Sequence, residues 1–308
     1  MTFTEAEILA QPELWARTLS IASGPGKALR GVLEGPVALV GAGSSYYVGL
    51  AAAAYLEERG FWKARAVPAS TYRPRRQEAA VLISRSGTTT EAVEAAQAAR
   101  AAGVFVGTVT CEPESPLTQL ADAAVVLDFV QERSVVQTGS ATSALLLLRA
   151  LIDELAGRAP PVELPVELRR ALATPLEAPD ETAHMVVLGS GWRFGVACEA
   201  ALKVQEMAQM WTERYPPLEY RHGPLSCAGA GTLVVVLDPP DRRIHRLAAD
   251  IEATGARVML ARYDPLVELV RLQRLAVRMS LRRGLNPDAP RHLTRSVVLN
   301  GSDAGEEA

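Results

Sequence analysis

The 308-residue sequence has few cysteines, few aromatic residues and no marked excess of charge of either sign. Its cysteines, Cys111, Cys198 and Cys227, are odd in number and widely spaced, and no two of them form a C-x-x-C pair. This spacing offers no cysteine pair for a metal site and fits a reducing compartment.

The charge pattern and the apolar runs exclude two further classes of protein. A net charge of −3 leaves no basic surface for nucleic acid and no polybasic patch for a membrane. No apolar run reaches the roughly 18 residues that a membrane-spanning helix needs. The start, MTFTEAEILAQPELW, is polar and acidic, unlike a signal peptide. We therefore expect a cytoplasmic globular protein without nucleic-acid or membrane partners.

Strand and helix patterns alternate along the chain. Short apolar runs at 36–40 and 79–84 end in small residues, and helical patterns follow at 46–60 and 89–103. This alternation predicts parallel sheets with crossover helices. A segment with five prolines in 24 residues, 158–181, then predicts a linker with a short helix.

The pattern restarts after this linker. Three segments of the second half match segments of the first at a nearly constant offset, namely MVVLGSG (185–191) with ALVGAGS (38–44), TLVVVLD (232–238) with AAVLISR (79–85), and ATGARVMLA (253–261) with AAGVFVGTV (101–109). We predict an α/β fold of two domains, 1–158 and 159–308, each a parallel sheet flanked by helices in a doubly wound, flavodoxin-like three-layer sandwich.

Hydroxyl residues gather after two strands of the first copy. GAGSS (41–45) and SRSGTTT (84–90) each lie between a predicted strand and a helix. Helix N-termini carry unpaired N–H groups that favour an anion, and glycine allows close approach of the backbone. We therefore predict a phosphate site, whose ligands would be Ser45, Ser84, Ser86 and Thr89.

The alternative is ordinary helix capping, because Thr88 and Glu91 have the spacing of a capping box. One capping residue is enough for a helix, however, and a double cluster exceeds that need. The second copy has DPPDRR (238–243) at the matching place, where aspartates would repel an anion. One copy is therefore expected to bind phosphate and the other to do something else.

A charged stripe interrupts an apolar helix predicted over 192–211. Glu199, Lys203 and Glu206 are spaced by four and three residues and so share one helix face. A solvated ladder of ion pairs is the simpler interpretation. The flanking residues are apolar nearly all round, however, so the stripe should face a cleft or be paired internally. A glutamate placed between burial and a lysine is suited to moving protons.

One histidine has a distinctive setting. His222 lies in a loop beside a rigid Gly-Pro pair and near Glu219, whereas the other histidines have no such neighbours. A single histidine is more often incidental. No histidine pair has metal-ligand spacing, so no metal is expected, and no G-x-S-x-G elbow is present.

Taken together, the motifs resemble a tandem of two SIS (sugar isomerase) domains. That family includes the isomerase half of glucosamine-6-phosphate synthase, amino-sugar-6-phosphate deaminase/isomerases and fructosamine-6-phosphate deglycases. The resemblance covers nearly the whole chain. The motifs that carry it are GAGSSY (41–46), SRSGTT (84–89), SVVQTGSAT (134–142), CEAALKVQE (198–206), EYRHGP (219–224) and RHLTRSV (291–297).

The resemblance implies roles for particular residues. Glu206 would be the base that moves a proton between C1 and C2, with Lys203 beside it. His222 would assist ring opening from the neighbouring subunit of a homodimer, so that the active site is shared. Arg295 would lie over the sugar. The sugar phosphate would be held by the phosphate-site residues, namely Ser45, Ser84, Arg85, Ser86 and Thr89.

The sequence also departs from the synthase. Arg85 replaces a glutamine, Thr88 a glutamate and Arg295 a lysine, and a guanidinium stays protonated, so a Schiff base at Arg295 is not expected. Thr2 follows Met1, so no glutaminase activity is expected, and removal of an amine fits better than its addition.

We predict an enzyme of the aldose–ketose isomerase or amino-sugar-phosphate deaminase type. It would act, without a cofactor, on a hexosamine or ketosamine 6-phosphate. Two alternatives stay open. One is a fructosamine-6-phosphate deglycase, whose substrate carboxylate would meet Arg295. The other is a non-catalytic regulator that binds a sugar phosphate.

Overall fold

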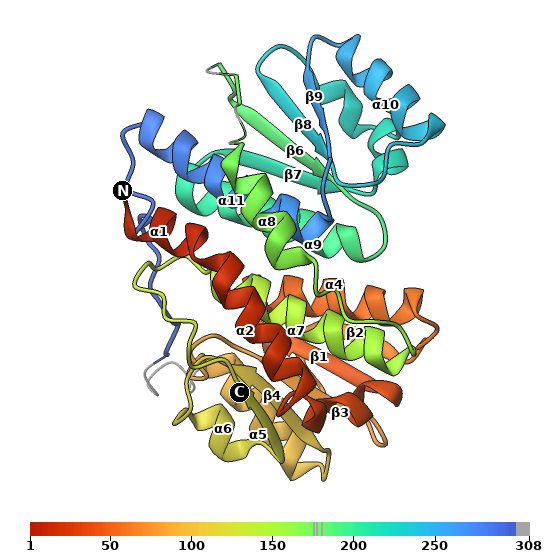
Figure 1. The fold of residues 1–308 in the computed structure, drawn as a ribbon, viewed down its shortest axis with the longest axis vertical. Helices are drawn as coiled ribbons and strands as arrows, with labels where there is room; N and C mark the ends of the chain where they lie inside the picture. The colour runs from red at the N-terminus through yellow and green to blue at the C-terminus, as the bar shows by residue number, and fades with distance from the viewer. Residues whose placement is uncertain (175, 177, 180, 300–308) are drawn as a thin grey trace, which may run out of the picture.

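Two parallel β-sheets, each flanked by helices, make up the protein (Figure 1). The computed structural model describes residues 1–174, 176, 178–179 and 181–299. The strand orders are β2-β1-β3-β4-β5 and β7-β6-β8-β9. The strands are β1 (Val37–Gly41), β2 (Ala64–Pro68), β3 (Ala79–Ile83), β4 (Val106–Thr110), β5 (Ala123–Val126), β6 (His184–Leu188), β7 (Trp211–Tyr215), β8 (Thr232–Val236) and β9 (Arg257–Leu260). The first order is that of flavodoxin-like sheets, and the predicted fold class is confirmed.

The strand order also confirms the internal repeat. β6, β8 and β9 occupy the positions that β1, β3 and β4 have in the first sheet. β5 has no counterpart among the described strands of the second sheet. The edge strand β7 was not predicted. The helix predicted over 192–211 is shorter than expected, and it ends at Ala208 because Gln209 adopts a left-handed conformation with φ of 49°.

The same turn leads from strand to helix in both copies. Gly43 has φ 54° and ψ −125°, and Gly191 has φ 53° and ψ −131°. Side chains other than hydrogen rarely allow this conformation. Each glycine directly precedes a helix, α4 (Ser44–Glu58) in the first copy and α9 (Trp192–Ala208) in the second.

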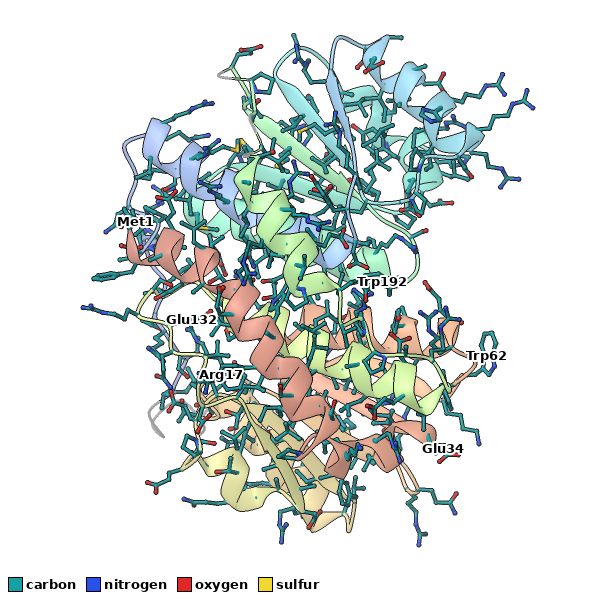
Figure 2. The ribbon with its side chains drawn as sticks, in the orientation of Figure 1. Met1, Arg17, Glu34, Trp62, Glu132 and Trp192 are labelled. Carbon is teal, nitrogen blue, oxygen red and sulfur yellow. The ribbon has the colours of Figure 1, made fainter. Side chains whose placement is uncertain are left out.

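These two helices pack against each other where the two halves meet. A Cβ on Gly195 would lie only 2.4 Å from the backbone nitrogen of Ala51, so glycine permits the close approach. Trp192, labelled in Figure 2, meets Tyr55 edge to face, with ring centroids 5.5 Å apart. One continuous apolar core includes residues of both sheets.

The other helices cover the sheets and link the halves. They are α1 (Phe3–Leu9), α2 (Gln11–Ser23), α3 (Lys27–Arg30), α5 (Thr90–Ala101), α6 (Pro116–Leu120), α7 (Gly139–Leu155), α8 (Leu164–Ala173), α10 (Arg242–Glu252) and α11 (Pro265–Arg282), with short 3-10 turns η1 (Gly31–Glu34), η2 (Ala69–Thr71), η3 (Pro217–Arg221) and η4 (Pro224–Cys227). α8 is the short helix expected in the proline-rich segment. The domain boundary at 158/159 stays a prediction, and residues 300–308 lie outside the described part. Within the described part, none of the helices combines the length and apolar character of a membrane span.

Candidate functional site

The charged stripe of α9 meets the glycine loop that follows β1. Lys203, which is wholly buried, donates a hydrogen bond of 2.9 Å from Nζ to Ser44 Oγ. The same ammonium lies 2.6 Å from Glu206 Oε2 and 3.5 Å from Glu199 Oε1. Internal pairing, one of the two arrangements expected for this stripe, is therefore observed, and the partner outside the helix is Ser44.

Burial and charge act in opposite directions on this group of side chains. Burial raises the pKa of Glu199 to about 7, against the lowering effect of Lys203. Burial opposes the charge of Lys203, but Glu199 and Glu206 outweigh it and raise the pKa of Lys203 above its ordinary value. The lysine is therefore a fixed cation in the described structure, whereas Glu199 changes its charge near neutral pH.

Glu206 is the member of the stripe that reaches an open space. Its side chain is 19% exposed and lines a cavity of about 420 Å³. The cavity is also lined by Gln205, Gln209, Met210, Trp211, Arg291, His292 and Leu293. The space is large enough for a ligand of the size of a sugar.

Within one chain, His222 does not line this cavity. It is exposed in the loop between η3 and η4, and its N–H donates to the carbonyl of Glu219 at 2.9 Å. The neighbouring Arg221 forms an ion pair of 3.0 Å with Asp250 of α10. A contribution of His222 to the Glu206 site therefore requires a second copy of the chain and stays a prediction.

The first copy brings its two hydroxyl clusters together. Ser45, Ser84 and Arg85 line one small cavity of about 10 Å³, together with Gln137 and Ser140. A space of this size holds about one water molecule. Ser84 Oγ accepts a hydrogen bond of 3.1 Å from the N–H of Gly87 and so shapes the turn. The sequence had linked these segments only by their places at neighbouring strand ends.

The capping box predicted for Thr88 and Glu91 is wrong. α5 begins at Thr90, and its N-cap residue Thr89 makes no side-chain capping hydrogen bond. The Thr90 N–H donates instead to the carbonyl of Val297 in the C-terminal segment, at 3.2 Å. Capping by local side chains therefore does not explain why hydroxyls gather here.

Ser296 lies against the remaining hydroxyls of this loop. Its Oγ is 3.1 Å from Ser86 Oγ, 3.0 Å from Thr88 Oγ1 and 3.5 Å from Thr89 Oγ1. The C-terminal segment thus runs from the Glu206 cavity, at Arg291, to the hydroxyl-rich loop at 84–90. Two of the four hydroxyls predicted to bind phosphate, those of Ser86 and Thr89, are thus partnered by the hydroxyl of Ser296.

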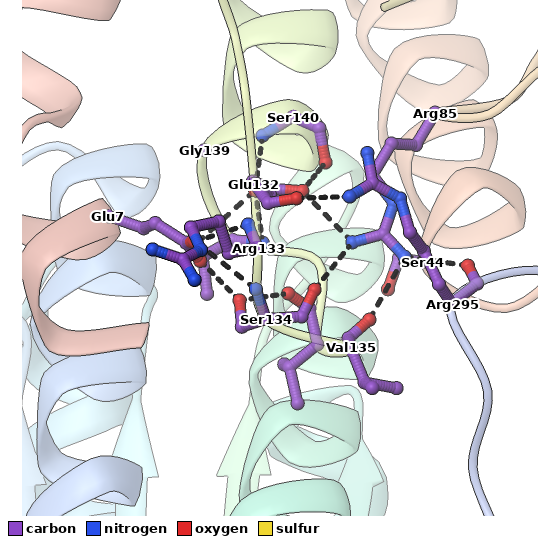
Figure 3. Close-up of polar contacts among 12 residues, drawn as sticks. Glu7, Ser44, Arg85, Glu132, Arg133, Ser134, Val135, Gly139, Ser140 and Arg295 are labelled. Atoms are coloured by element: carbon purple, nitrogen blue, oxygen red, sulfur yellow. Dashed lines mark hydrogen bonds and ion pairs between the residues drawn. The ribbon is translucent and has the colours of Figure 1, made fainter. Parts of the chain in front are cut away.

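Arg85 points into the protein. Nη1 is 3.1 Å from Glu132 Oε2, and Nη2 donates to the carbonyls of Val135 and Arg295 at 3.0 and 2.7 Å (Figure 3). Glu132 also accepts from the N–H and hydroxyl of Ser140, at 3.0 and 2.7 Å. Burial opposes the charge of Glu132, but Arg85 and these donors hold its pKa below the usual range. Arg85 thus ties three segments together, and its role as a phosphate ligand stays a prediction.

The guanidinium of Arg295 is likewise in contact with protein acceptors. Nη1 donates to the carbonyl of Glu132, and Nη2 lies 3.5 Å from Glu112 Oε1. The side chain is 43% exposed. Arg295 therefore lies beside the loop that contains Glu132, and its contact with a sugar stays a prediction.

The second copy shows what replaces the hydroxyl cluster. At the end of β8, Asp238 accepts hydrogen bonds from the N–H of Ser190, at 2.9 Å, and from its hydroxyl. Asp241 caps α10 through the N–H groups of Arg243 and Ile244, both at 2.8 Å. Aspartate carboxylates of the protein thus occupy positions where an anion would have to bind, as the repulsion argument anticipated.

Sequence reasoning missed three residues of this region: Ser44, Glu132 and Ser296. Ser44 and Ser296 lay within quoted motifs, but only a neighbouring residue of each was chosen. Glu132 precedes the motif at 134–142, whose hydroxyl residues were the one available signal. Among the described residues, no group of three or more His, Cys, Asp and Glu side chains could hold a metal ion.

Comparison with known families agrees with this architecture. Residues 34–153 match the SIS domain, and the chain with its two parallel sheets resembles SIS-domain proteins. It is 28% identical to a glutamine–fructose-6-phosphate aminotransferase (isomerizing) of Xylella fastidiosa, over 96% of this chain and 59% of that protein. The chain thus spans less than two thirds of this relative.

Solved structures resemble the chain along nearly all of its length. Glucosamine-6-phosphate deaminase of Thermotoga maritima is 29% identical, with a TM-score of 0.84, over 97% of this chain and all of that one. Tagatose-6-phosphate ketose/aldose isomerase of Escherichia coli has a TM-score of 0.81 at 24% identity, over 97% of this chain and 96% of that one, a likeness of fold. These comparisons confirm the resemblance to SIS-domain proteins with two parallel sheets.

Proposed function

We propose that the protein is a phosphosugar isomerase of deaminase type, acting on a hexosamine or ketosamine 6-phosphate. The observation that carries the proposal is the bridge formed by Lys203. This ammonium contacts Ser44, next to the predicted phosphate ligand Ser45, and Glu206, at the edge of an open cavity. The loop predicted to bind an anion and the group predicted to transfer a proton thus contact the same buried cation. The names of the relatives support this substrate class.

The phosphate would anchor the end of the sugar that does not react. Ser45, Ser84, Ser86 and Thr89 are neutral donors around the N-termini of α4 and α5, where helix dipoles favour an anion. Binding of a phosphate there requires Ser296 to release the hydroxyls that it contacts. The anchored phosphate would then fix the reacting carbons near Glu206, which lowers the entropic cost of the chemical step.

The proton transfer would proceed on the open-chain sugar. Glu206 removes the proton from C2 of the 2-amino aldose, and the electron pair forms a C1–C2 double bond while the carbonyl oxygen takes up a proton. Glu206 then returns its proton to C1, which leaves an iminium ion at C2. Water adds to the iminium ion and the nitrogen leaves as ammonium, which gives the ketose phosphate. A carboxylate at the C1–C2 bond and a nearby cation are the groups that this chemistry needs.

His222 would open the sugar ring from the neighbouring subunit of a homodimer. Its exposure, and its absence from the residues that line the Glu206 cavity of its own chain, support this assignment. Arg295 and Arg85 would hold the C-terminal segment over the site. The contacts of Arg295 with Glu132 and Glu112 do not favour its pairing with a substrate carboxylate, as the deglycase alternative would require.

A panel of substrates tests the proposal against its alternatives. The purified protein is incubated with hexosamine 6-phosphates and with glycated amino-acid 6-phosphates, and ammonia, free amino acid and ketose phosphate are assayed. We expect ammonia and ketose phosphate from a hexosamine 6-phosphate, and no turnover by Glu206→Gln. Release of an amino acid would favour the deglycase. Binding without any product would favour a sugar-phosphate regulator.

A further inference from the structure

Glu199 is a buried carboxylate that the proposed reaction does not use. It lies one turn before Lys203 on α9 and is only 2% exposed. In the described part of the chain neither of its carboxylate oxygens has a hydrogen bond of good geometry, although the Ser44 hydroxyl and the Lys203 ammonium lie close enough to lower its pKa. Its one close ionic contact there is Lys203 Nζ, 3.5 Å from Oε1. A buried carboxylate with so few well-formed contacts is costly, so this position calls for a role beyond packing.

The ammonium of Lys203 stands between two carboxylates of different exposure. Glu206, at 2.6 Å, faces the cavity, whereas Glu199 is enclosed. A carboxylate that has an ammonium to itself holds a proton weakly, and one that shares the ammonium with a second carboxylate holds it more strongly. The charge of Glu199 therefore changes how Lys203 acts on Glu206.

We propose that Glu199 is a positioning residue that acts on Glu206 through Lys203. When Glu199 is ionised it shares the ammonium, and Glu206 then accepts a proton more readily. The protonation of Glu199 therefore sets the pH above which the site turns over. This inference rests on the proposed function, in which Glu206 moves a proton between C1 and C2.

The surroundings of Glu199 give the direction of the pH effect. Burial raises the pKa of Glu199 to about 7, against the lowering effect of Lys203 beside it. At lower pH Glu199 is protonated, and Lys203 then forms an ion pair with Glu206 alone. At higher pH both carboxylates share the ammonium. The rate of turnover should therefore rise with pH through the neutral range.

Among the described residues, neighbouring elements bring few other titratable or charged groups close to Glu199 and Lys203. From α4, Ser44 lies beside the same ammonium, and Tyr47 has a raised pKa through burial, with a smaller contribution from Glu199. From β7, Arg214 approaches the Tyr47 hydroxyl at 3.4 Å. Burial also raises the pKa of the adjacent Cys198 thiol to about 11, so that thiol stays neutral in the tested range.

The test compares Glu199→Gln with the wild type in steady-state kinetics between about pH 6 and pH 8. We expect kcat of the wild type to rise with pH, and kcat of Glu199→Gln to be about tenfold lower at the upper end, without that rise. KM should change by less than about threefold. Glu57→Gln, on an exposed residue of α4, is the matched control and should keep the wild-type profile. A variant profile that follows the wild type, or a loss confined to KM, overturns the proposal.

Two further measurements cover other outcomes. If the glutamine variant does not fold, Glu199→Met replaces it, because methionine keeps the volume without a buried polar group. A wild-type kcat that does not change with pH overturns the proposal without any variant. If the wild type turns over no phosphosugar, the proposed function fails separately. Glu199 is then followed by carboxyl ¹³C NMR. A signal that titrates near neutral pH and is missing from the variant supports the inference. Titration of every glutamate in the ordinary range overturns it.

Discussion

Lys203 donates a hydrogen bond of 2.9 Å to Ser44, across a sequence separation of 159 residues. Ser44 begins α4 in the first copy, and Lys203 lies on α9, the equivalent helix of the second copy. A lysine has three N–H donors and no acceptor, and this buried ammonium has one hydroxyl and two carboxylates around it. The contact joins the two copies at the point where the proposed site lies.

Removal of the lysine should therefore cost far more than removal of its hydroxyl partner. We expect Lys203→Met to lower the free energy of unfolding by about 3–5 kcal/mol, because it leaves a buried carboxylate without its cation. Ser44→Ala should lower it by about 1 kcal/mol, the contribution of a single hydrogen bond. Urea denaturation measures both values.

The double variant separates a direct contact from two independent losses. If Lys203 and Ser44 interact as the structure shows, the effects of the two substitutions should depart from additivity by more than about 0.5 kcal/mol. Lys63→Met, at an exposed position, serves as the control and should stay within about 0.5 kcal/mol of the wild type. Additive effects would contradict the coupling.

Stability should depend on pH through Glu199. Burial raises its pKa in the folded protein to about 7, against the lowering effect of Lys203, from an ordinary value of 4.5. A raised folded-state pKa means that the fold favours the protonated form. That contribution is fully present below the unfolded-state pKa and is lost as the pH rises through about 7. Over this range the wild type should lose on the order of 3 kcal/mol of unfolding free energy relative to Glu199→Gln.

Urea denaturation of both proteins at a series of pH values between about 5 and 8 measures this difference. The wild-type curve should fall relative to the curve of the variant, because glutamine does not titrate. Parallel curves would show that Glu199 is ionised over the whole range in both the folded and the unfolded protein, and would contradict the raised pKa.

Several elements of this fold could be predicted from the sequence because they carry their own signal. β1, β3, β6 and β8 are buried apolar runs, and the repeated turns at Gly43 and Gly191 follow β1 and β6. β7 carries no such run. It is an edge strand whose sequence, WTERY, has three polar residues between an exposed tryptophan and a half-buried tyrosine. An edge strand needs no continuous apolar stretch, so its pattern resembles that of a loop.

The sequence predicted those features of the site that depend on local geometry. It did not predict contacts with residues that are distant in the sequence. The spacing of Glu199, Lys203 and Glu206 indicated one helix face, since helix geometry is local. The bond to Ser44 depends on how α4 and α9 cross. The direction of Arg85 depends on a buried acceptor 47 residues away, Glu132, and no local pattern contains that information.

Arg85 should prove to be a structural residue of the loop. We expect Arg85→Ala to lower the free energy of unfolding by about 3 kcal/mol, the lower end for a broken buried ion pair. Glu132 keeps the hydrogen bonds from Ser140 and Thr138, which limits the loss. Thermal or urea denaturation measures the change.

An exposed arginine is the matched control. Arg100 forms an ion pair of 3.3 Å with Asp122, and both side chains are more than 40% exposed. Arg100→Ala should cost less than about 1 kcal/mol, as surface pairs do. Equal effects of the two substitutions would contradict the structural role of Arg85. If Arg85→Ala also abolishes stabilisation by added inorganic phosphate, Arg85 is a phosphate ligand after all.

The proposed contribution of His222 from a second subunit can be tested by mixing two inactive variants. His222→Ala lacks the ring-opening group, and Glu206→Gln lacks the base. In a symmetric dimer with shared sites, each site takes His222 from one chain and Glu206 from the other. A mixed dimer of the two variants therefore contains one site with both substitutions and one site with neither.

Activity should return when the two variants are unfolded together and refolded as a mixture. Random pairing makes half of the dimers mixed, each with one intact site, so about a quarter of the wild-type kcat is expected. Each variant refolded alone is the control and should stay inactive. If both groups acted within one chain, no dimer would contain an intact site and the mixture would remain inactive. That result would assign His222 to its own subunit or remove it from the reaction.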